Sequence, residues 1–241
     1  MQEDGKSMGF FYRLSCLWLF AGVLALAGCV DREPQQRAAF IHFLQTRVLD
    51  APGALAPRLS DHEREELGDY DEHYEVIEAF QQALGAGMDE LDQALRTLSL
   101  HSLGEIAERG AQFEALRGRL EQRRRDLMQA LARADEARAT LLQADDLKQA
   151  YAPAYHHAVT EPAAALLAVY PAILDTLADA HRVAQFAQTH AGQLLIDGPL
   201  AQVRDPSVQA RFNTLLTQLN GRSGDIDAAA RQLQALRSPT P

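Results

Sequence analysis

The residues with the clearest chemical meaning lie near the amino end, where Leu26, Ala27, Gly28 and Cys29 follow one another. An aliphatic residue, two small residues and a cysteine form the lipobox pattern. In that chemistry a diacylglyceryl group alkylates the thiol, and a membrane peptidase then cleaves before the cysteine. Small side chains at Ala27 and Gly28 let the backbone lie in the peptidase cleft. The pattern therefore predicts lipid attachment at Cys29, with Leu26, Ala27 and Gly28 as the residues that the signal peptidase recognises.

The segment before this tetrapeptide is typical of a signal peptide. Residues 14–27 contain one clearly polar side chain, Ser15, and Arg13 precedes them. A spanning helix needs about 20 apolar residues, so the stretch is short for a permanent transmembrane anchor. It fits the apolar region of a secretory leader, which predicts a lipoprotein signal peptide over residues 1–28. An ordinary leader with an incidental cysteine, or a short uncleaved anchor, is the alternative.

The extreme amino end is less regular. Glu3 and Asp4 are unusual in a signal peptide, and translation from Met8 instead of Met1 would remove them. Cys16 would be lost with the leader, which leaves Cys29 as the single thiol of the mature chain. No disulfide is then expected within one chain, even in an oxidising compartment.

Residues 29–36 are predicted to be a lipidated tether. Burial of acyl chains contributes about 0.8 kcal/mol per CH₂, and lipobox proteins carry two or three chains, so the membrane is an expected partner. Val30 occupies the sorting position, where Asp would favour inner-membrane retention in enteric bacteria. Val30 favours the outer membrane, although Asp31 follows it. The expected location is the cell envelope, with the body facing the periplasm.

No other group of residues predicts a catalytic or metal site. His62 and Glu66, and also Asp69 and His73, are spaced to share a helix face, but the two histidines at i and i+4 with Glu between them that a zinc helix requires are absent. An acidic, solvated face explains them better. No nucleophile elbow, P-loop or dinucleotide glycine motif occurs, so we expect no cofactor and no enzymatic activity.

Composition argues against nucleic acid as a partner. The formal net charge is −10, and an acidic body is repelled by phosphates. Ala, Leu, Gln, Arg and Glu dominate while aromatic residues make up 7%, a balance that favours helix over strand.

The apolar periodicity predicts an all-α, elongated bundle of long amphipathic helices over residues 37–238. Ser60 with Glu63, and Ser102 with Glu105, are capping boxes that open two of the helices. Asp197-Gly198 is the turn of a possible short hairpin near 193–203. The expected helices are 35–49, 61–99, 103–143, 145–158, 161–190 with a kink or split at Pro171, 206–219, and a last one ending near 237. In 103–143, packing on neighbouring helices is favoured over a self-associating coiled coil.

The sequence resembles the YiaF-like lipoproteins of Gram-negative bacteria, a family with a domain of unknown function. The resemblance rests on residues 28–31 (GCVD), 36–45 (QRAAFIHFLQ), 145–155, which begins DDLK, and 159–163 (VTEPA). It implies a lipoprotein and a Gram-negative envelope, and it supplies no activity and no functional residue beyond Cys29.

Two functions fit these observations. The preferred one is a non-enzymatic structural or interaction module of the envelope, with other envelope proteins as possible partners. The alternative is a ligand-binding bundle or an unrecognised envelope enzyme, whose site would use carboxylates with Tyr70, Tyr74 or Tyr155. The sequence leaves the ligand, the activity and the oligomeric state open.

Overall fold

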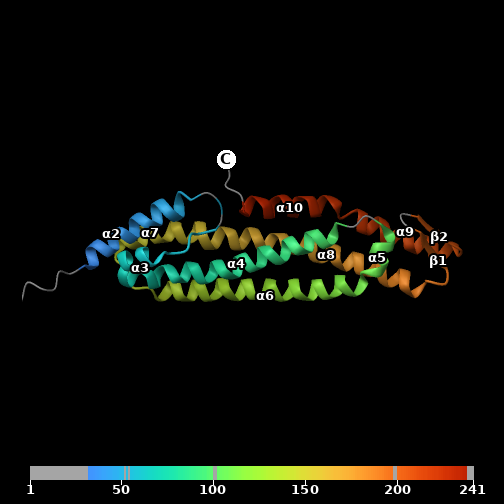
Figure 1. Cartoon of the computed structure of the whole chain (residues 1–241), viewed down its shortest axis with the longest axis horizontal. Coiled ribbons are helices and arrows are strands. Elements are labelled where there is room, and N and C mark those ends of the chain that lie inside the picture. The colour runs from blue at the N-terminus through green and yellow to red at the C-terminus, as the bar shows by residue number, and fades with distance from the viewer. Residues whose placement is uncertain (1–31, 52, 54, 100–101, 198–199, 238–241) are drawn as a thin grey trace, which may run out of the picture.

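The computed structural model of the chain describes residues 32–51, 53, 55–99, 102–197 and 200–237. Long helices lie side by side along one axis, so the predicted all-α elongated bundle is confirmed (Figure 1). The elements are α2 (Glu33–Phe43), η2 (Leu44–Leu49), α3 (Asp61–Leu67), η3 (Gly68–Tyr70), α4 (Asp71–Leu98), α5 (Leu103–Glu108), α6 (Gly110–Thr140), α7 (Asp145–Tyr155), η4 (His156–Thr160), α8 (Glu161–Thr189), β1 (Leu194–Asp197), β2 (Leu200–Val203), α9 (Pro206–Asn220) and α10 (Ser223–Arg237). Residues 33–36, expected in the tether, form the first turn of α2.

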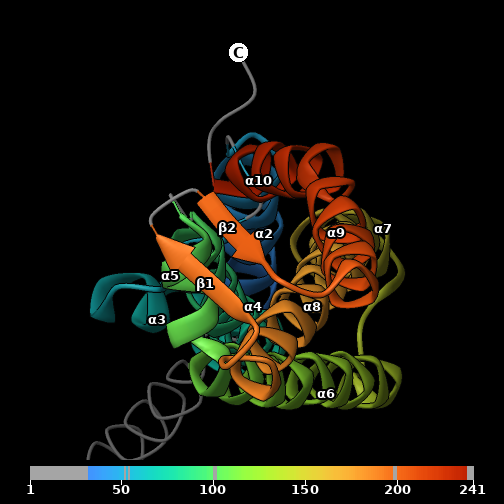
Figure 2. The ribbon, with the colours of Figure 1, turned by 90° about the vertical axis from the view of Figure 1, so that its right-hand side faces the viewer.

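The central element is α8, which packs against α4, α5, α6, α9 and α10. The end-on view shows α8 enclosed by these helices (Figure 2). Its buried face includes Leu166, Tyr170, Ile173 and Leu177, each fully shielded from solvent. The continuous helix Asp145–Thr189 is the one in the described chain that is long and apolar enough to cross a membrane. Packing on several sides already accounts for its apolar composition.

The helix over 145–189 corrects two expectations. Thr160 was expected to cap a new helix, but its backbone is helical and its side chain makes no cap hydrogen bond, so α7 continues through the π-helical turn η4 into α8. Of the kink or split expected at Pro171, the split is wrong, because α8 runs through this residue without a break. The ring of Pro171 is exposed, and on the solvent side water can bind the carbonyl that proline leaves without an N–H partner.

The helix expected over 61–99 is interrupted near its start, at Gly68, whereas α4 runs without a break through Gly85 and Gly87. Gly68 has φ of 55° and ψ of −131°, a conformation that other residues adopt only with strain. A Cβ at this position would also overlap the side-chain amide of Gln36. The break turns α3 away from α4, and α2 packs against α3 and η3 at this bend.

The stretch 103–143 also forms two helices, α5 and α6, with the interruption at Arg109. Ser102 caps α5 by accepting a hydrogen bond from the backbone N–H of Glu105 at 3.2 Å. Gly110 then lets the chain approach α8 closely, because a Cβ there would lie 3.0 Å from Ala184 Cβ. The apolar side of α6 packs on α4 and α8, which agrees with packing on neighbouring helices.

The expected hairpin is present, but its turn is shifted. Antiparallel pairing joins Leu194 to Val203 and Asp197 to Leu200, so Asp197 ends a strand and the connection consists of residues 198–199. That connection lies outside the described residues. The helices α9 and α10 agree within a few residues with the expected helix 206–219 and the expected last helix. Gly224, expected before the last helix, lies inside α10.

The bundle has two poles. The amino-terminal pole holds the start of α2, α3, η3 and the turn 141–144, and the hairpin pole holds β1, β2 and α9 (Figure 1). The 31 residues of α6 span about 46 Å at 1.5 Å per residue, which sets the scale of the separation.

Candidate functional site

The lipobox residues Leu26, Ala27, Gly28 and Cys29, and the sorting residue Val30, lie outside the described part of the chain. Their nearest described neighbours are Arg32 and the first turn of α2 at the amino-terminal pole. An acyl group on Cys29 would therefore attach the bundle by one end, because α2 begins at Glu33, four positions later.

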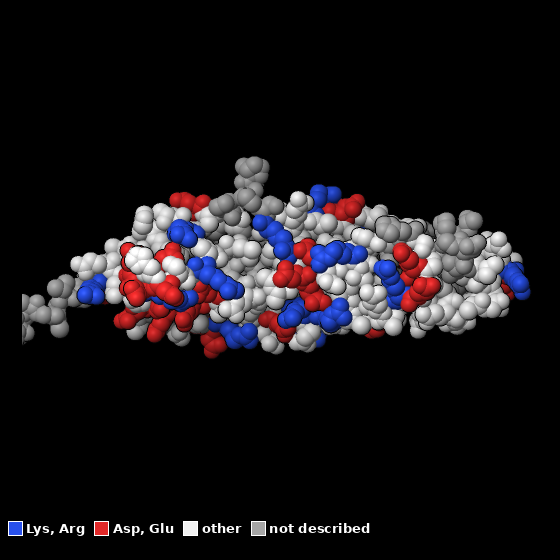
Figure 3. Space-filling view, viewed as in Figure 1, with Lys and Arg blue, Asp and Glu red and all other residues white. Residues whose placement is uncertain are grey.

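The amino-terminal pole is strongly acidic. Residues 61–75 contain eight Asp or Glu residues and a single basic one, Arg64. Figure 3 shows the red side chains gathered over this end of the molecule. Arg64 donates to Glu78 Oε2 at 2.9 Å, and this hydrogen bond raises the pKa of the guanidinium. Arg47 also pairs with Glu63, at 3.2 Å, but Glu65, Glu66 and Asp69 are exposed, so negative charge faces solvent here.

The three tyrosines proposed for a ligand or enzyme site are used in packing. Tyr70 donates to Glu33, Tyr74 to the Pro57 carbonyl at 2.6 Å, and Tyr155 to Asp135 Oδ1 at 2.8 Å. Burial raises the pKa of Tyr70 to about 12, and it raises the pKa of Tyr74 and Tyr155 further. All three hydroxyls therefore stay protonated near neutral pH, and the structure does not bring the three together around a pocket.

The histidine and carboxylate group is also dispersed. His62, Glu66 and Asp69 are exposed, whereas His73 packs edge-on against Tyr70 with ring centroids 5.2 Å apart. Burial lowers the pKa of His73, and its Nδ1 lies 3.2 Å from the amide of Gln143. Within the described part of the chain, no three His, Cys, Asp or Glu side chains lie close enough to hold a metal ion.

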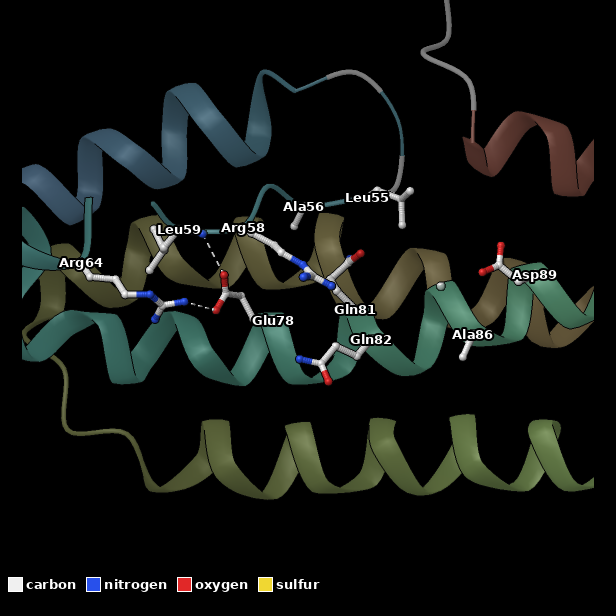
Figure 4. A pocket seen from close by; sticks show the side chains of 11 residues that line it. Leu55, Ala56, Arg58, Leu59, Arg64, Glu78, Gln81, Gln82, Ala86 and Asp89 are labelled. Atoms are coloured by element: carbon white, nitrogen blue, oxygen red, sulfur yellow. Dashed lines mark hydrogen bonds and ion pairs between the residues drawn. The ribbon is translucent and has the colours of Figure 1, made fainter. Parts of the chain in front are cut away.

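A groove with a volume of about 770 Å³ lies between α4 and the segment 55–59 (Figure 4). Two hydrogen bonds hold the segment in place: Leu59 N–H donates to Glu78 Oε1 at 2.8 Å, and Tyr74 donates to the Pro57 carbonyl. Ser60 and Glu63 form the full capping box predicted at the start of α3, which fixes the end of this segment.

The floor of the groove joins α4 to the π-helical turn η4. Gln81 donates from Nε2 to the Ala158 carbonyl at 2.6 Å, which satisfies a carbonyl in the irregular turn. Gly85 adds no side chain, and a Cβ there would meet nothing within 4 Å. The space above this part of α4 therefore stays open.

The lining of the groove supports binding more than covalent chemistry. Its polar groups are guanidinium, amide and carboxylate, and its described lining residues include no Ser, Thr, Cys, His, Tyr or Lys. Glu78 is fixed by Leu59 and Arg64, so it is not placed as a general base. Arg58 reaches from the 55–59 segment toward Gln81 and is the exposed cation of the site (Figure 4).

Sequence reasoning did not identify this groove. Arg58, Glu78 and Gln81 occupy ordinary solvated positions in the helical pattern, and nothing in their spacing indicates that residues 55–59 fold back over α4. The contact depends on tertiary structure, since 19 positions separate Leu59 from Glu78.

A family model described as "Protein of unknown function (DUF3053)" matches residues 17–234. The chain belongs to this family. It is 31% identical over 174 residues to the "Uncharacterized protein YiaF" of Escherichia coli K12, covering 70% of this chain and 71% of that protein. The same identity and coverage hold for the protein of that name from Shigella flexneri. These matches confirm the resemblance drawn from the sequence, and no solved structure matches the chain.

Proposed function

We propose that the protein is a lipid-anchored envelope protein that faces the periplasm and acts as a non-enzymatic structural or interaction module. The observation that carries this proposal is the position of α2, which begins four residues after Cys29 at one end of an elongated bundle. A tether this short would hold the amino-terminal pole at the membrane surface. The long sides and the hairpin pole would then be available to partners.

The energetics favour stable attachment. Two or three acyl chains, at about 0.8 kcal/mol per buried CH₂, give effectively permanent binding where one chain would give only marginal binding. The net charge of −10 would repel anionic lipid headgroups, which disfavours an orientation in which the protein body lies flat on the bilayer. Val30 supports the outer membrane as the site of attachment.

The test is metabolic labelling with a palmitate analogue, with membrane fractionation of the same cells. Cys29→Ser should abolish labelling and release the body from the membrane fraction. Cys16→Ser is the matched control, because it removes the other cysteine of the leader and should leave labelling unchanged. Equal labelling of wild type and Cys29→Ser would contradict the proposal.

The interaction role has its own test. Crosslinking in cells, followed by capture of the lipidated protein, should recover a reproducible set of envelope proteins. Capture that returns the same proteins as an unrelated outer-membrane lipoprotein would count against an interaction role, while leaving the anchor intact.

A second candidate, ligand binding in the groove over α4, is favoured by its volume of about 770 Å³. Arg58 would contact such a ligand from the 55–59 segment. Arg58→Ala should weaken binding of any ligand found by screening the purified protein, whereas Arg231→Ala on α10 should not. Equal effects of the two variants would exclude this groove as the binding site.

A further inference from the structure

A second, smaller groove lies near the hairpin pole, between the end of α8 and the middle of α9. Its volume is about 340 Å³, within the range of small-molecule sites. It is lined by Arg182 of α8, by His190 just after α8 and by Arg211 of α9, together with the apolar side chains of Phe186 and Leu215. No carboxylate is among its described lining residues, in contrast to the acidic character of the chain as a whole.

The apolar part of this groove has a defined shape. Phe186 stacks on His190 with ring centroids 4.0 Å apart, and it also stacks on Phe212 at 5.9 Å. Phe212 is buried, and His190 is fixed by a hydrogen bond of 2.9 Å between its Nδ1 and the Phe186 carbonyl. These ring contacts hold Phe186 in place, and its partly exposed side chain adds apolar surface to the groove.

The two arginines differ in how they are held. Asp179, which is buried, pairs with Arg182 and also accepts from Arg222 Nε at 2.9 Å. This ion pair orients the Arg182 guanidinium, while 47% of the Arg182 side chain remains exposed. Arg211 is exposed, and within the described residues its side chain has no ion pair or hydrogen bond. One guanidinium is therefore fixed in position, and the other is available to a ligand.

We propose that this groove binds a small organic anion, in which a carboxylate or phosphate group is attached to an aromatic or aliphatic group. Guanidinium groups bind both oxyanions through charge-assisted, frequently bidentate hydrogen bonds. The oxyanion lies between Arg182 and Arg211, and the apolar group lies on Phe186 and Leu215. The proposal gives the interaction module a ligand chemistry, and it stands on residues remote from the lipid anchor.

The test is a ligand-observed NMR titration of the full chain, extracted from membranes in detergent, with phenyl phosphate as the probe. Phenyl phosphate should bind more tightly than inorganic phosphate, which lacks the ring, and than benzyl alcohol, which lacks the charge. Benzoate in a parallel titration tells whether carboxylate or phosphate is preferred. Arg211→Glu should weaken binding at least about tenfold, because it removes one charge-assisted contact and adds a repulsive charge.

The matched control is Arg231→Glu, which makes the same charge change at an exposed position of α10 outside the groove. It should leave affinity within about twofold, a difference typical of remote surface charges. Equal weakening by both variants, or phenyl phosphate binding no tighter than inorganic phosphate, would overturn the proposal. Neither result would bear on the anchor, which the labelling of Cys29 tests separately.

Discussion

The two poles of the bundle are built differently. At the amino-terminal pole, Phe40, Tyr74, Tyr151 and Tyr155 are fully buried, and each of these tyrosine hydroxyls donates a hydrogen bond across elements. At the hairpin pole, α9 has one buried residue in its 15, Phe212. The first pole is an interlocked aromatic core. The second is held by Phe212, by Leu194 of β1 and by apolar side chains of α9 that are only partly buried.

This difference separates stability from recognition along one axis. Protein segments with few buried apolar contacts open at lower free energy than the core, and binding surfaces are often drawn from such segments. The amino-terminal pole is densely packed and acidic, and the hairpin pole carries the basic groove. The following predictions test whether the poles differ in this way.

The largest expected effect is at Phe40, which lies among Tyr70, His73 and Tyr151 with ring centroids 5.8, 6.3 and 6.2 Å away. Phe40→Ala should lower the free energy of global unfolding by about 3–5 kcal/mol, from lost burial and the cavity left behind. Urea denaturation followed by circular dichroism measures it.

Phe212→Ala is the counterpart at the hairpin pole. It should raise amide hydrogen exchange in α9 strongly while the exchange of α4 and α6 stays near the wild-type rate, because α9 loses its one buried anchor. Uniform faster exchange in all helices would mean that the two poles unfold as one unit, and the comparison would fail.

The contrast between the poles also explains what could be predicted from the sequence. Helical periodicity located most elements, and the Ser60 capping box gave the start of α3, because these signals lie within a few residues of one another. The break at Gly68 depends on Gln36 from another helix, and the continuity through Thr160 depends on packing around η4. The arginines of the hairpin groove converge only because α9 folds back on α8, so their spacing of 29 positions carried no signal.

The next effect in size is expected at Asp179 of α8, whose side chain is 2% exposed. Asp179 pairs with Arg222, which lies in the turn between α9 and α10. Asp179→Asn should destabilise the protein by about 2–3 kcal/mol, less than for a fully buried pair because both arginine partners reach solvent. Asp175→Asn is the control, since Asp175 is 58% exposed and pairs with the same Arg222. Thermal unfolding of both variants should show a clearly lower midpoint for Asp179→Asn alone.

A smaller pair of changes compares Gly68, in the amino-terminal pole, with Gly224, at the start of α10. Gly68→Ala should cost about 1–2 kcal/mol, because alanine must adopt the strained backbone and displace the Gln36 side chain. Gly224→Ala, in α10 with nothing near an added Cβ, should stabilise by up to about 1 kcal/mol. The denaturant midpoints of the two variants should therefore move in opposite directions. A shift of the same sign in both would refute the contrast between a strained glycine at 68 and an unrestrained one at 224.

The smallest effect is a pH dependence that belongs to the amino-terminal pole. Burial lowers the pKa of His73 below its ordinary 6.5, so on acidification the unfolded chain binds the proton before the folded chain does. Stability from this residue is present above about pH 6.5, falls as the pH drops below that value, and levels off below the folded-state pKa. His73→Gln should flatten this part of the profile, measured by urea unfolding at several pH values. An unchanged slope would show that other groups carry the acid sensitivity, and that His73 packs there without an energetic penalty for charging.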